Sequence, residues 1–120
     1  MAKITIPVVT PSLNELLNMN RHARTRLKKS YMAHIEGAVH DMKMTVNKLK
    51  RPKRRRLRIW SFRKRLLDPD NFIGGTKPLT DALKDLGLIW DDSTEYISFG
   101  AEQFPDKYDP RTEVFIEEIK

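Results

Sequence analysis

Two aspartates separated by one proline are the first residues whose types and spacing could do chemistry. They are Asp68 and Asp70, in the run Asp68-Pro69-Asp70-Asn71. Proline disfavours helical backbone in the residue before it, so we expect an extended segment, in which residues two apart point the same way. Two carboxylates that face one place attract a divalent cation, and hard oxygen ligands favour Mg²⁺, with Mn²⁺ as a substitute. The alternative is an Asx-type turn without a ligand.

A lysine and a second acidic pair follow the first pair along the chain. They are Lys77, Asp91 and Asp92. A lysine beside metal-bound carboxylates can hold a scissile phosphate, or stabilise the charge that develops during attack. The first pair, Lys77 and one of the later aspartates therefore predict a metal-dependent phosphodiesterase site. Taken separately, the later pair would be a solvated turn and Lys77 an ordinary surface lysine.

Charge is distributed unevenly along the chain. Residues 1–67 carry 18 basic and 3 acidic residues, whereas residues 68–120 carry 5 basic and 13 acidic ones. The densest stretch is 50–65, with ten basic residues in sixteen. Such a stretch favours a polyanion, because each phosphate that it neutralises releases counterions, and the alternative is a merely solubilising surface. The predicted DNA-binding residues are Arg21, Arg24, Arg26, Arg54, Arg55, Arg56, Arg58, Arg63, Lys64 and Arg65.

The elements that must position these residues follow from the spacing of apolar side chains. Residues 3–9 alternate as a short strand, whereas residues 11–29 have poor periodicity, which is typical of a loop. Apolar residues at helical spacing predict a long amphipathic helix over 30–49. Residues 55–62 alternate as a central strand with one apolar face and one cationic or aromatic face.

The second half of the chain predicts one helix and two strands. Residues 76–87 have a capping threonine, an early proline and a terminal glycine, which indicates a helix. Residues 95–104 and 112–119 predict strands joined by a turn. The order β-α-β-α-β-β predicts an α+β fold: one domain over residues 1–120, with a mixed sheet of about four strands packed with two main helices.

The composition excludes several classes of protein. The 120 residues include no cysteine, so disulfides and Cys-based zinc sites are excluded. No apolar run approaches the roughly 20 residues that span a bilayer, and the first residues are too polar for a secretory leader. The run Gly74-Gly75-Thr76-Lys77 lacks the full phosphate-loop pattern. We therefore expect a cytoplasmic protein without a nucleotide cofactor.

Over nearly the whole chain, these motifs resemble those of the RusA family of Holliday junction resolvases. The family carries Asp-x-Asp-Asn after a basic strand, then a lysine and an Asp-Ala-Leu helix, then a paired Asp-Asp. The matching runs here are Asp68-Pro69-Asp70-Asn71, Lys77, Asp81-Ala82-Leu83 and Asp91-Asp92, with Pro11-Ser12-Leu13-Asn14 similar to the family's turn after the first strand. The resemblance implies Asp68, Asp70 and Asp92 as metal-binding catalytic acids and Lys77 as the partner of the phosphate. It leaves open whether Asp91 also ligates.

The resemblance also implies a function: a magnesium-dependent endodeoxyribonuclease that resolves four-way DNA junctions in recombination and repair. A metal-activated water would attack the phosphodiester in line. Paired symmetrical nicks need two sites, so we expect a C2 homodimer. One departure concerns Lys77, which follows Asp70 by seven residues, more than in the family. We expect Gly74 and Gly75 to form a flexible connection there, which leaves the reach of the lysine open.

Other functions stay open on the sequence. The first is a non-catalytic basic DNA-binding protein, in which the acidic half only balances the charge. The second is a metal nuclease that acts on flaps, forks, other branched DNA or RNA. A third is an interaction protein whose basic strand binds an acidic partner, which predicts no preference for branched DNA.

Overall fold

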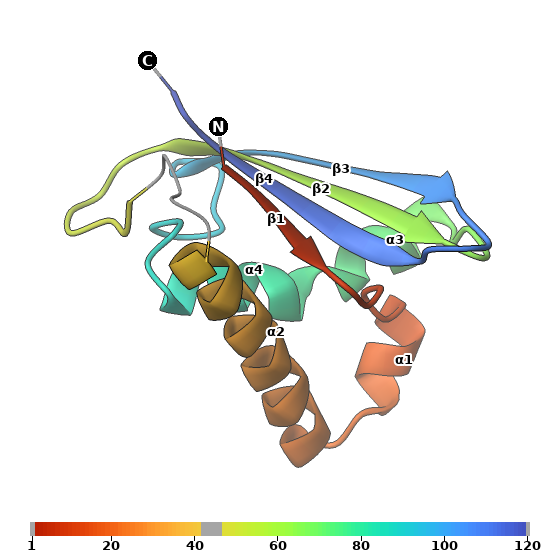
Figure 1. Ribbon diagram of the computed structural model, residues 1–120. Helices are drawn as coiled ribbons and strands as arrows, with labels where there is room; N and C mark the ends of the chain where they lie inside the picture. The colour runs from red at the N-terminus through yellow and green to blue at the C-terminus, as the bar shows by residue number, and fades with distance from the viewer. Residues whose placement is uncertain (1, 42–46, 120) are drawn as a thin grey trace.

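A mixed sheet and a layer of helices make up the fold (Figure 1). The computed structural model describes residues 2–41 and 47–119. Within them the elements are β1 (Ala2–Ile6), α1 (Leu13–Asn18), α2 (Arg21–Asp41), β2 (Arg55–Arg63), α3 (Pro69–Gly75), α4 (Lys77–Asp85), β3 (Ile97–Pro105) and β4 (Arg111–Glu118). The predicted α+β class is confirmed, and two short helices, α1 and α3, add to the predicted order. No helix in the described part is long and apolar enough to cross a membrane.

The strands form one sheet in the order β1-β4-β2-β3. Strand β4 is antiparallel to both of its neighbours, and β2 and β3 are parallel. A parallel pair needs a crossover connection, and α3 and α4 supply it between β2 and β3. This crossover carries Asp68, Asp70 and Lys77, so the sheet topology decides where the predicted site residues lie.

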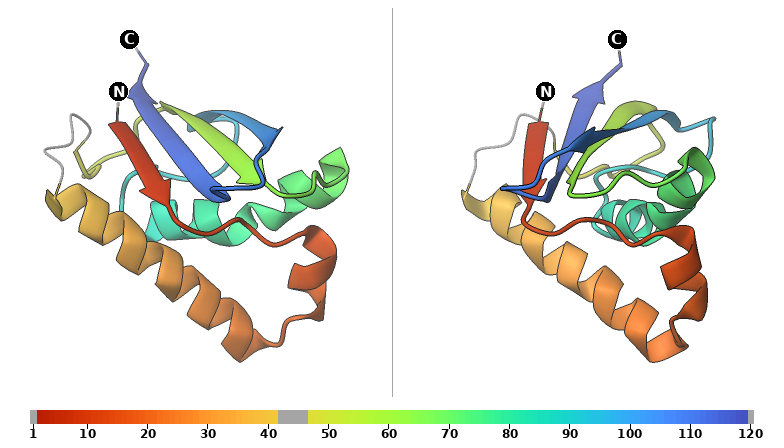
Figure 2. Two further views of the ribbon diagram at one scale, coloured as in Figure 1. Left: turned by 45° about the vertical axis from the view of Figure 1, so that its right-hand side comes forward. Right: turned by 90° about the vertical axis from the view of Figure 1, so that its right-hand side faces the viewer.

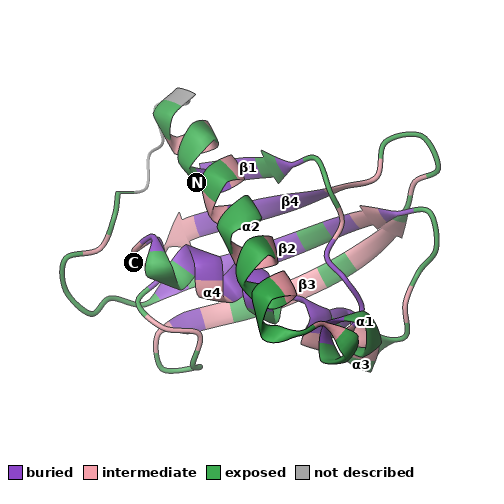
Figure 3. Cartoon of the chain, turned by 90° about the horizontal axis from the view of Figure 1, so that it is seen from below, coloured by how far each residue is buried: buried purple, intermediate pink, exposed green. Residues whose placement is uncertain are grey.

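The core lies between the sheet and the helices. Figure 3 shows α2 and α4 crossing the buried side of the sheet. Strand β1 alternates buried and exposed residues, as does most of β2, so one face of each strand enters the core. The largest fully buried side chains are Tyr31, Ile4, Ile6, Ile35, Leu57, Ile59, Leu79, Leu83, Leu88, Ile89, Ile116 and Val114.

The predicted loop over 11–29 is wrong, because it contains α1 and the first turns of α2. Ser12 caps α1 in a reciprocal pair with Glu15: each side chain accepts a hydrogen bond from the other residue's backbone amide. The Asn20 side chain accepts from Ala23 N at 2.8 Å, so α2 begins after Asn20 and not at Ser30. The predicted end at residue 49 is also wrong, since 47–49 are not helical, and 42–46 lie outside the described residues.

The periodicity of 11–29 is poor because of where these turns lie. Figures 1 and 2 show that the first turns of α2, next to α1, are the part of the helix farthest from the strands. They have little core to face, and arginine and lysine have good helix propensity. Helix formation here therefore follows from caps and propensity and not from an apolar stripe.

The opposite face of the sheet carries aromatic side chains. Within the described residues no helix covers this face (Figure 1). Trp60 lies 4.6 Å from Phe115 between ring centroids, and Phe62 lies 5.1 Å from Phe104. The Arg111 guanidinium carbon lies 3.9 Å from the centre of the Phe62 ring. Trp60 and Phe62 are thus packed in a surface cluster on the side of the sheet away from α4.

Candidate functional site

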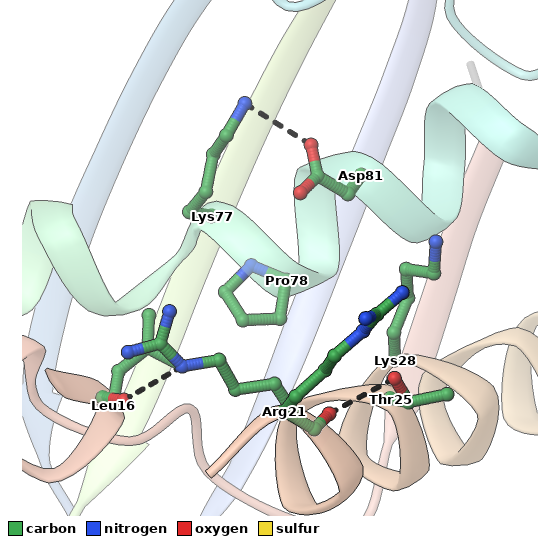
Figure 4. A pocket seen from close by; sticks show the side chains of 8 residues that line it. Leu16, Arg21, Thr25, Lys28, Lys77, Pro78 and Asp81 are labelled. Atoms are coloured by element: carbon green, nitrogen blue, oxygen red, sulfur yellow. Dashed lines mark hydrogen bonds and ion pairs between the residues drawn. The ribbon is translucent and has the colours of Figure 1, made fainter. Parts of the chain in front are cut away.

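Lys77 lies between two carboxylates at the start of α4. Its Nζ is 3.1 Å from Asp81 Oδ1, one turn along the same helix, and it also pairs closely with Asp92 Oδ2. Figure 4 shows the contact between Lys77 and Asp81. The structure thus brings together two of the predicted site residues, Lys77 and Asp92. It adds Asp81, which we did not predict as a site residue, although lysine and aspartate four apart on a helix are natural partners.

Local sequence signals place these three side chains. Pro78 occupies the first turn of α4, so Lys77 begins the helix. The predicted cap at Thr76 is wrong: its hydroxyl donates to Ile73 O at 2.7 Å, back along α3, and makes no side-chain cap hydrogen bond to α4. Gly87 has a φ of 77°, a left-handed conformation that favours glycine, and it ends α4. The buried residues Leu88 and Ile89 then anchor the connection that leads to Asp91 and Asp92.

Electrostatics keeps the Lys77 ammonium charged. Its hydrogen bond with Asp92, followed by that with Asp81, raises the pKa of Lys77 above its ordinary value. The Asp91 carboxyl accepts from the Asp92 backbone amide and pairs with Lys84 at 3.2 Å, and both contacts lower its pKa. Lys77 with its two carboxylates carries a net charge of −1. This cluster alone would repel a phosphate, so attraction must come from neighbouring cations.

The predicted extended segment at Asp68-Pro69-Asp70 is a helix start, which corrects that expectation. Asp68 itself is extended, with φ −64° and ψ 155°, as a residue before proline should be. Pro69 is then the first residue of α3, a position where its missing N–H costs nothing, and Asp70 lies in the first turn. The Asp68 carboxylate accepts from the Asn71 side chain at 2.6 Å and from its backbone amide at 3.2 Å, which lowers the pKa of Asp68. Asp68 is therefore a helix cap.

The opening Pro11-Ser12-Leu13-Asn14 run is the structural partner of α3. Asn14 N donates to Asn71 Oδ1 at 3.2 Å, which joins the two motifs directly. A Cβ atom at Gly75 would lie 1.8 Å from the Pro11 carbonyl oxygen, and one at Gly74 would lie 2.9 Å from the Leu13 side chain. The two glycines are therefore helical and tightly packed, and the expected flexible connection is wrong.

The predicted convergence of Asp68, Asp70 and Asp92 is not found. Among residues 2–41 and 47–119, no three or more Asp, Glu or His side chains lie close enough together to hold a metal ion. Helix α3 replaces the extended segment on which that expectation depended, and the Asp92 carboxylate holds Lys77 instead. The residues as arranged do not fit one three-carboxylate metal site. A magnesium requirement remains a prediction.

Two predicted DNA-binding arginines are buried and serve the fold. Arg55 donates to Leu88 O at 2.8 Å and pairs with Glu118 at 2.6 Å. Arg63 donates to the hydroxyls of Thr10 and Ser61, and burial lowers its pKa. Both lie on the face of β2 that enters the core, which corrects their assignment to DNA. The two-residue alternation already indicated this, since Arg55 and Arg63 are in phase with the buried Leu57 and Ile59.

The other predicted arginines and lysines lie at the surface. Arg56 pairs with Glu117 at 3.3 Å, and Arg58 donates to Ser98 O at 2.6 Å, so both already have partners on the open face of the sheet. No ion pair is found within the described residues for the exposed members Arg21, Arg24, Arg26, Arg54, Lys64 and Arg65.

Two hollows meet Lys77 from different sides. The α3–β3 hollow, of about 320 Å³, is lined by Ile73, Gly74, Thr76, Lys77, Thr80, Asp92, Thr94, Ile97 and Phe99. The α2–α4 groove, of about 370 Å³, is lined by Leu16, Arg21, Arg24, Thr25, Lys28, Lys77, Pro78 and Asp81 (Figure 4). Lys77 lines both, and its ammonium lies against Asp81, which lines the groove, and Asp92, which lines the hollow.

No protein-family model matches this chain, and no curated protein matches it. The resemblance to the RusA family therefore depends on the sequence motifs alone.

Proposed function

We propose that the chain binds branched DNA and hydrolyses a phosphodiester next to Lys77, acting as a homodimer in the cytoplasm. One observation supports this more than any other: Lys77, whose ammonium is held by Asp81 and Asp92, lines both the basic α2–α4 groove and the α3–β3 hollow. The order of motifs that resembles the RusA family supplies the reaction and the four-way junction as substrate.

Lys77 can serve a phosphate without losing its position. An ammonium has three donors, and Asp81 and Asp92 accept two of them. The third can bind a phosphate oxygen. A lysine ammonium is charged at neutral pH, and the two carboxylates, which raise the pKa of Lys77, favour that form further, so it can stabilise the negative charge that develops during attack. Asp81 and Asp92 act in this scheme as positioning residues.

A nicking assay on a synthetic four-way junction, with Mg²⁺ and with a chelator, tests the proposal. Lys77→Ala should reduce nicking about 100-fold or more, because a fixed charge at the reacting phosphate is lost. Junction affinity should change far less. Lys84→Ala is the matched control, since Lys84 lies on the same helix and also pairs with one aspartate. Equal losses of nicking in the two variants, or no nicking by the parent protein with any metal, would contradict the proposal.

The second candidate function is a junction-binding protein without catalysis. The separation of Asp68, Asp70 and Asp92 favours it, since these carboxylates form no common metal site within the described residues. Asp70→Asn separates the two functions. If Asp70 holds the metal that the RusA resemblance implies, the variant should abolish nicking and leave binding intact or stronger, whereas a pure binder has no nicking to lose. Asp109→Asn, at another exposed aspartate, is the control.

The dimer follows from paired nicks and has its own measurement. Two symmetrical cuts require two copies of the Lys77 cluster related by a two-fold axis. Sedimentation equilibrium of the free protein and of its junction complex should give two chains per particle in the complex. One chain per junction would contradict the resolvase proposal and leave other nucleases open.

A further inference from the structure

One face of α2 carries polar and basic residues at helical spacing. Arg21, Arg24, Thr25 and Lys28 recur at i, i+3, i+4 and i+7, and all four line the α2–α4 groove. The opposite wall comes from Lys77, Pro78 and Asp81 at the start of α4. The first turns of α2 lie away from the strands, so sheet packing does not explain this stripe (Figures 1 and 2).

The charges of the groove are not balanced within it. Four cations line it, and Asp81 is its one acidic lining residue in the described part of the chain. Asp81 already pairs with Lys77, and Lys28 pairs with Asp85 at 2.7 Å. Arg21 and Arg24 have no carboxylate partner among residues 2–41 and 47–119. The groove therefore presents two uncompensated guanidinium groups.

The Arg24 guanidinium is already held in place. Its Nε donates to Leu16 O at 3.1 Å, which ties it to α1. A guanidinium fixed through Nε can direct its terminal nitrogens at an anion, and a planar fork of donors suits phosphate oxygens. The groove volume of about 370 Å³ falls at the small end of the roughly 300–1,000 Å³ range of ligand sites. A phosphate with part of its sugar is a ligand of suitable size and charge.

We propose that the α2–α4 groove binds a phosphodiester group of a nucleic-acid strand, beside the phosphate that Lys77 contacts. The assignment to DNA rests on the proposed function, whereas the binding of a phosphate does not. Because Lys77 lines both the groove and the α3–β3 hollow, a strand in the groove runs on toward the second hollow. The groove then contributes affinity and strand position, and Lys77 contributes to the reaction.

The test compares two double variants of the full chain by fluorescence anisotropy on a labelled junction, in chelator so that no cleavage occurs. Arg21→Gln with Arg24→Gln removes both uncompensated groove cations. Arg26→Gln with Lys29→Gln is the matched control, since both residues are exposed on the same turns of α2 and do not line the groove. The groove pair should weaken binding about tenfold and lower the magnitude of the salt slope by about 2, and the control by less. Equal losses in the two pairs would overturn the proposal.

A second measurement separates the possible sources of the phosphate. Thr25→Glu keeps both arginines and places a negative charge in the groove, so it should weaken junction binding as the groove pair does, without lowering the thermal midpoint. In ¹⁵N spectra of the parent protein, a short single strand should shift the amides of residues 21–28 at lower concentration than inorganic phosphate does. Phosphate binding there without any effect of the strand would refute the nucleic-acid assignment. Failure to nick leaves these binding results unaffected and refutes only the proposed function.

Discussion

The packing of Gly75 against the opening turn gives a sharp prediction about how the site is held. A Cβ atom there would lie 1.8 Å from Pro11 O, 2.9 Å from Pro11 C and 3.2 Å from Ser12 C. All three are backbone atoms, which cannot rotate away as a side chain can. Gly37, inside α2, is the matched control, because a Cβ atom there would have no neighbour within 4 Å. We therefore compare Gly75→Ala with Gly37→Ala.

The two variants should change the free energy of unfolding in opposite directions. Alanine is favoured over glycine inside a helix by about 1 kcal/mol, so Gly37→Ala should stabilise the protein by about 0.5–1 kcal/mol. Gly75→Ala gains at most the same stability from helix propensity. Its Cβ atom must also push α3 away from the opening turn, and such overpacking costs about 1–3 kcal/mol or more. The variants should therefore differ by about 2 kcal/mol or more. With a urea m value of about 2 kcal/mol/M, their midpoints differ by about 1 M.

Urea unfolding followed by far-UV circular dichroism measures this difference directly. Under conditions where both variants are folded, Gly75→Ala should also lose nicking, because the displaced α3 carries Asp68 and Asp70 and leads into Lys77. Gly37→Ala should keep it. A Gly75→Ala midpoint equal to or above that of Gly37→Ala would refute the close packing of α3 on the Pro11–Asn14 turn.

Three further predictions concern single side chains. Asp92→Asn removes the largest cause of the raised pKa of Lys77, so an NMR titration should give a lower pKa for Lys77 than in the parent protein. A raised lysine pKa stabilises the fold at neutral pH, and this stabilisation is lost as the pH rises through the folded-state pKa. In the variant the stabilisation should be smaller, and its loss should be complete at a less alkaline pH than in the parent. Glu118→Gln leaves the buried Arg55 without its carboxylate and should cost about 2 kcal/mol at pH 7 in urea unfolding. The pKa of Glu118 is lowered by its cationic partners, so the parent loses this stabilisation as pH falls from about 4.5 through the folded-state value, and the variant should lack that acid-dependent loss. Tyr31 is buried, and its hydroxyl has no hydrogen-bond partner in the described residues; burial raises its pKa to about 12. Tyr31→Phe should therefore raise the free energy of unfolding by about 1 kcal/mol. A lower free energy of unfolding would indicate that the hydroxyl has a partner.

The sequence predicted well the elements that have a regular alternation or clear start and stop residues. Strand β2 follows its alternation, and α4 follows its early proline and its final Gly87. Helix α1 was missed although its capping residues, Ser12 and Glu15, are visible in the sequence, because the neighbouring basic residues obscured them. Periodicity detects a helix through the face that it buries, so a helix end that leaves the core escapes it.

The prediction of the candidate site succeeded where the site depends on local geometry and failed where it depends on the path of the chain. Lysine and aspartate four apart at Lys77 and Asp81 must meet if α4 forms. The approach of Asp92 to Lys77 requires the connection after α4 to fold back, which the motif order suggested and the residues alone did not. The prediction that Asp68 and Asp70 face one site was wrong for a different reason. After an extended residue, proline permits two local structures, a strand or the first turn of a helix. Asn71, which bonds to the Asp68 side chain, favours the helix.

The largest gap between sequence and structure concerns positive charge, and it changes where DNA should bind. The stretch 50–65 is the densest in cations, yet the fold uses much of it internally: Arg55 and Arg63 are buried, and Arg56 and Arg58 already have partners. Glu117 and Glu118 of β4 pair with Arg56 and Arg55, because β4 lies beside β2 in the sheet. Within the described residues, exposed cations without an ion pair remain along the first turns of α2 and also at Arg54, Lys64 and Arg65, on either side of the paired part of β2. Density of charge in a sequence measures how many cations a segment has, whereas the field outside the protein depends on those without partners. The proposed strand path follows α2 and Lys77, so salt-dependent affinity should respond more to Arg21 and Arg24 than to Arg55 and Arg56, whose charges are paired with Glu118 and Glu117.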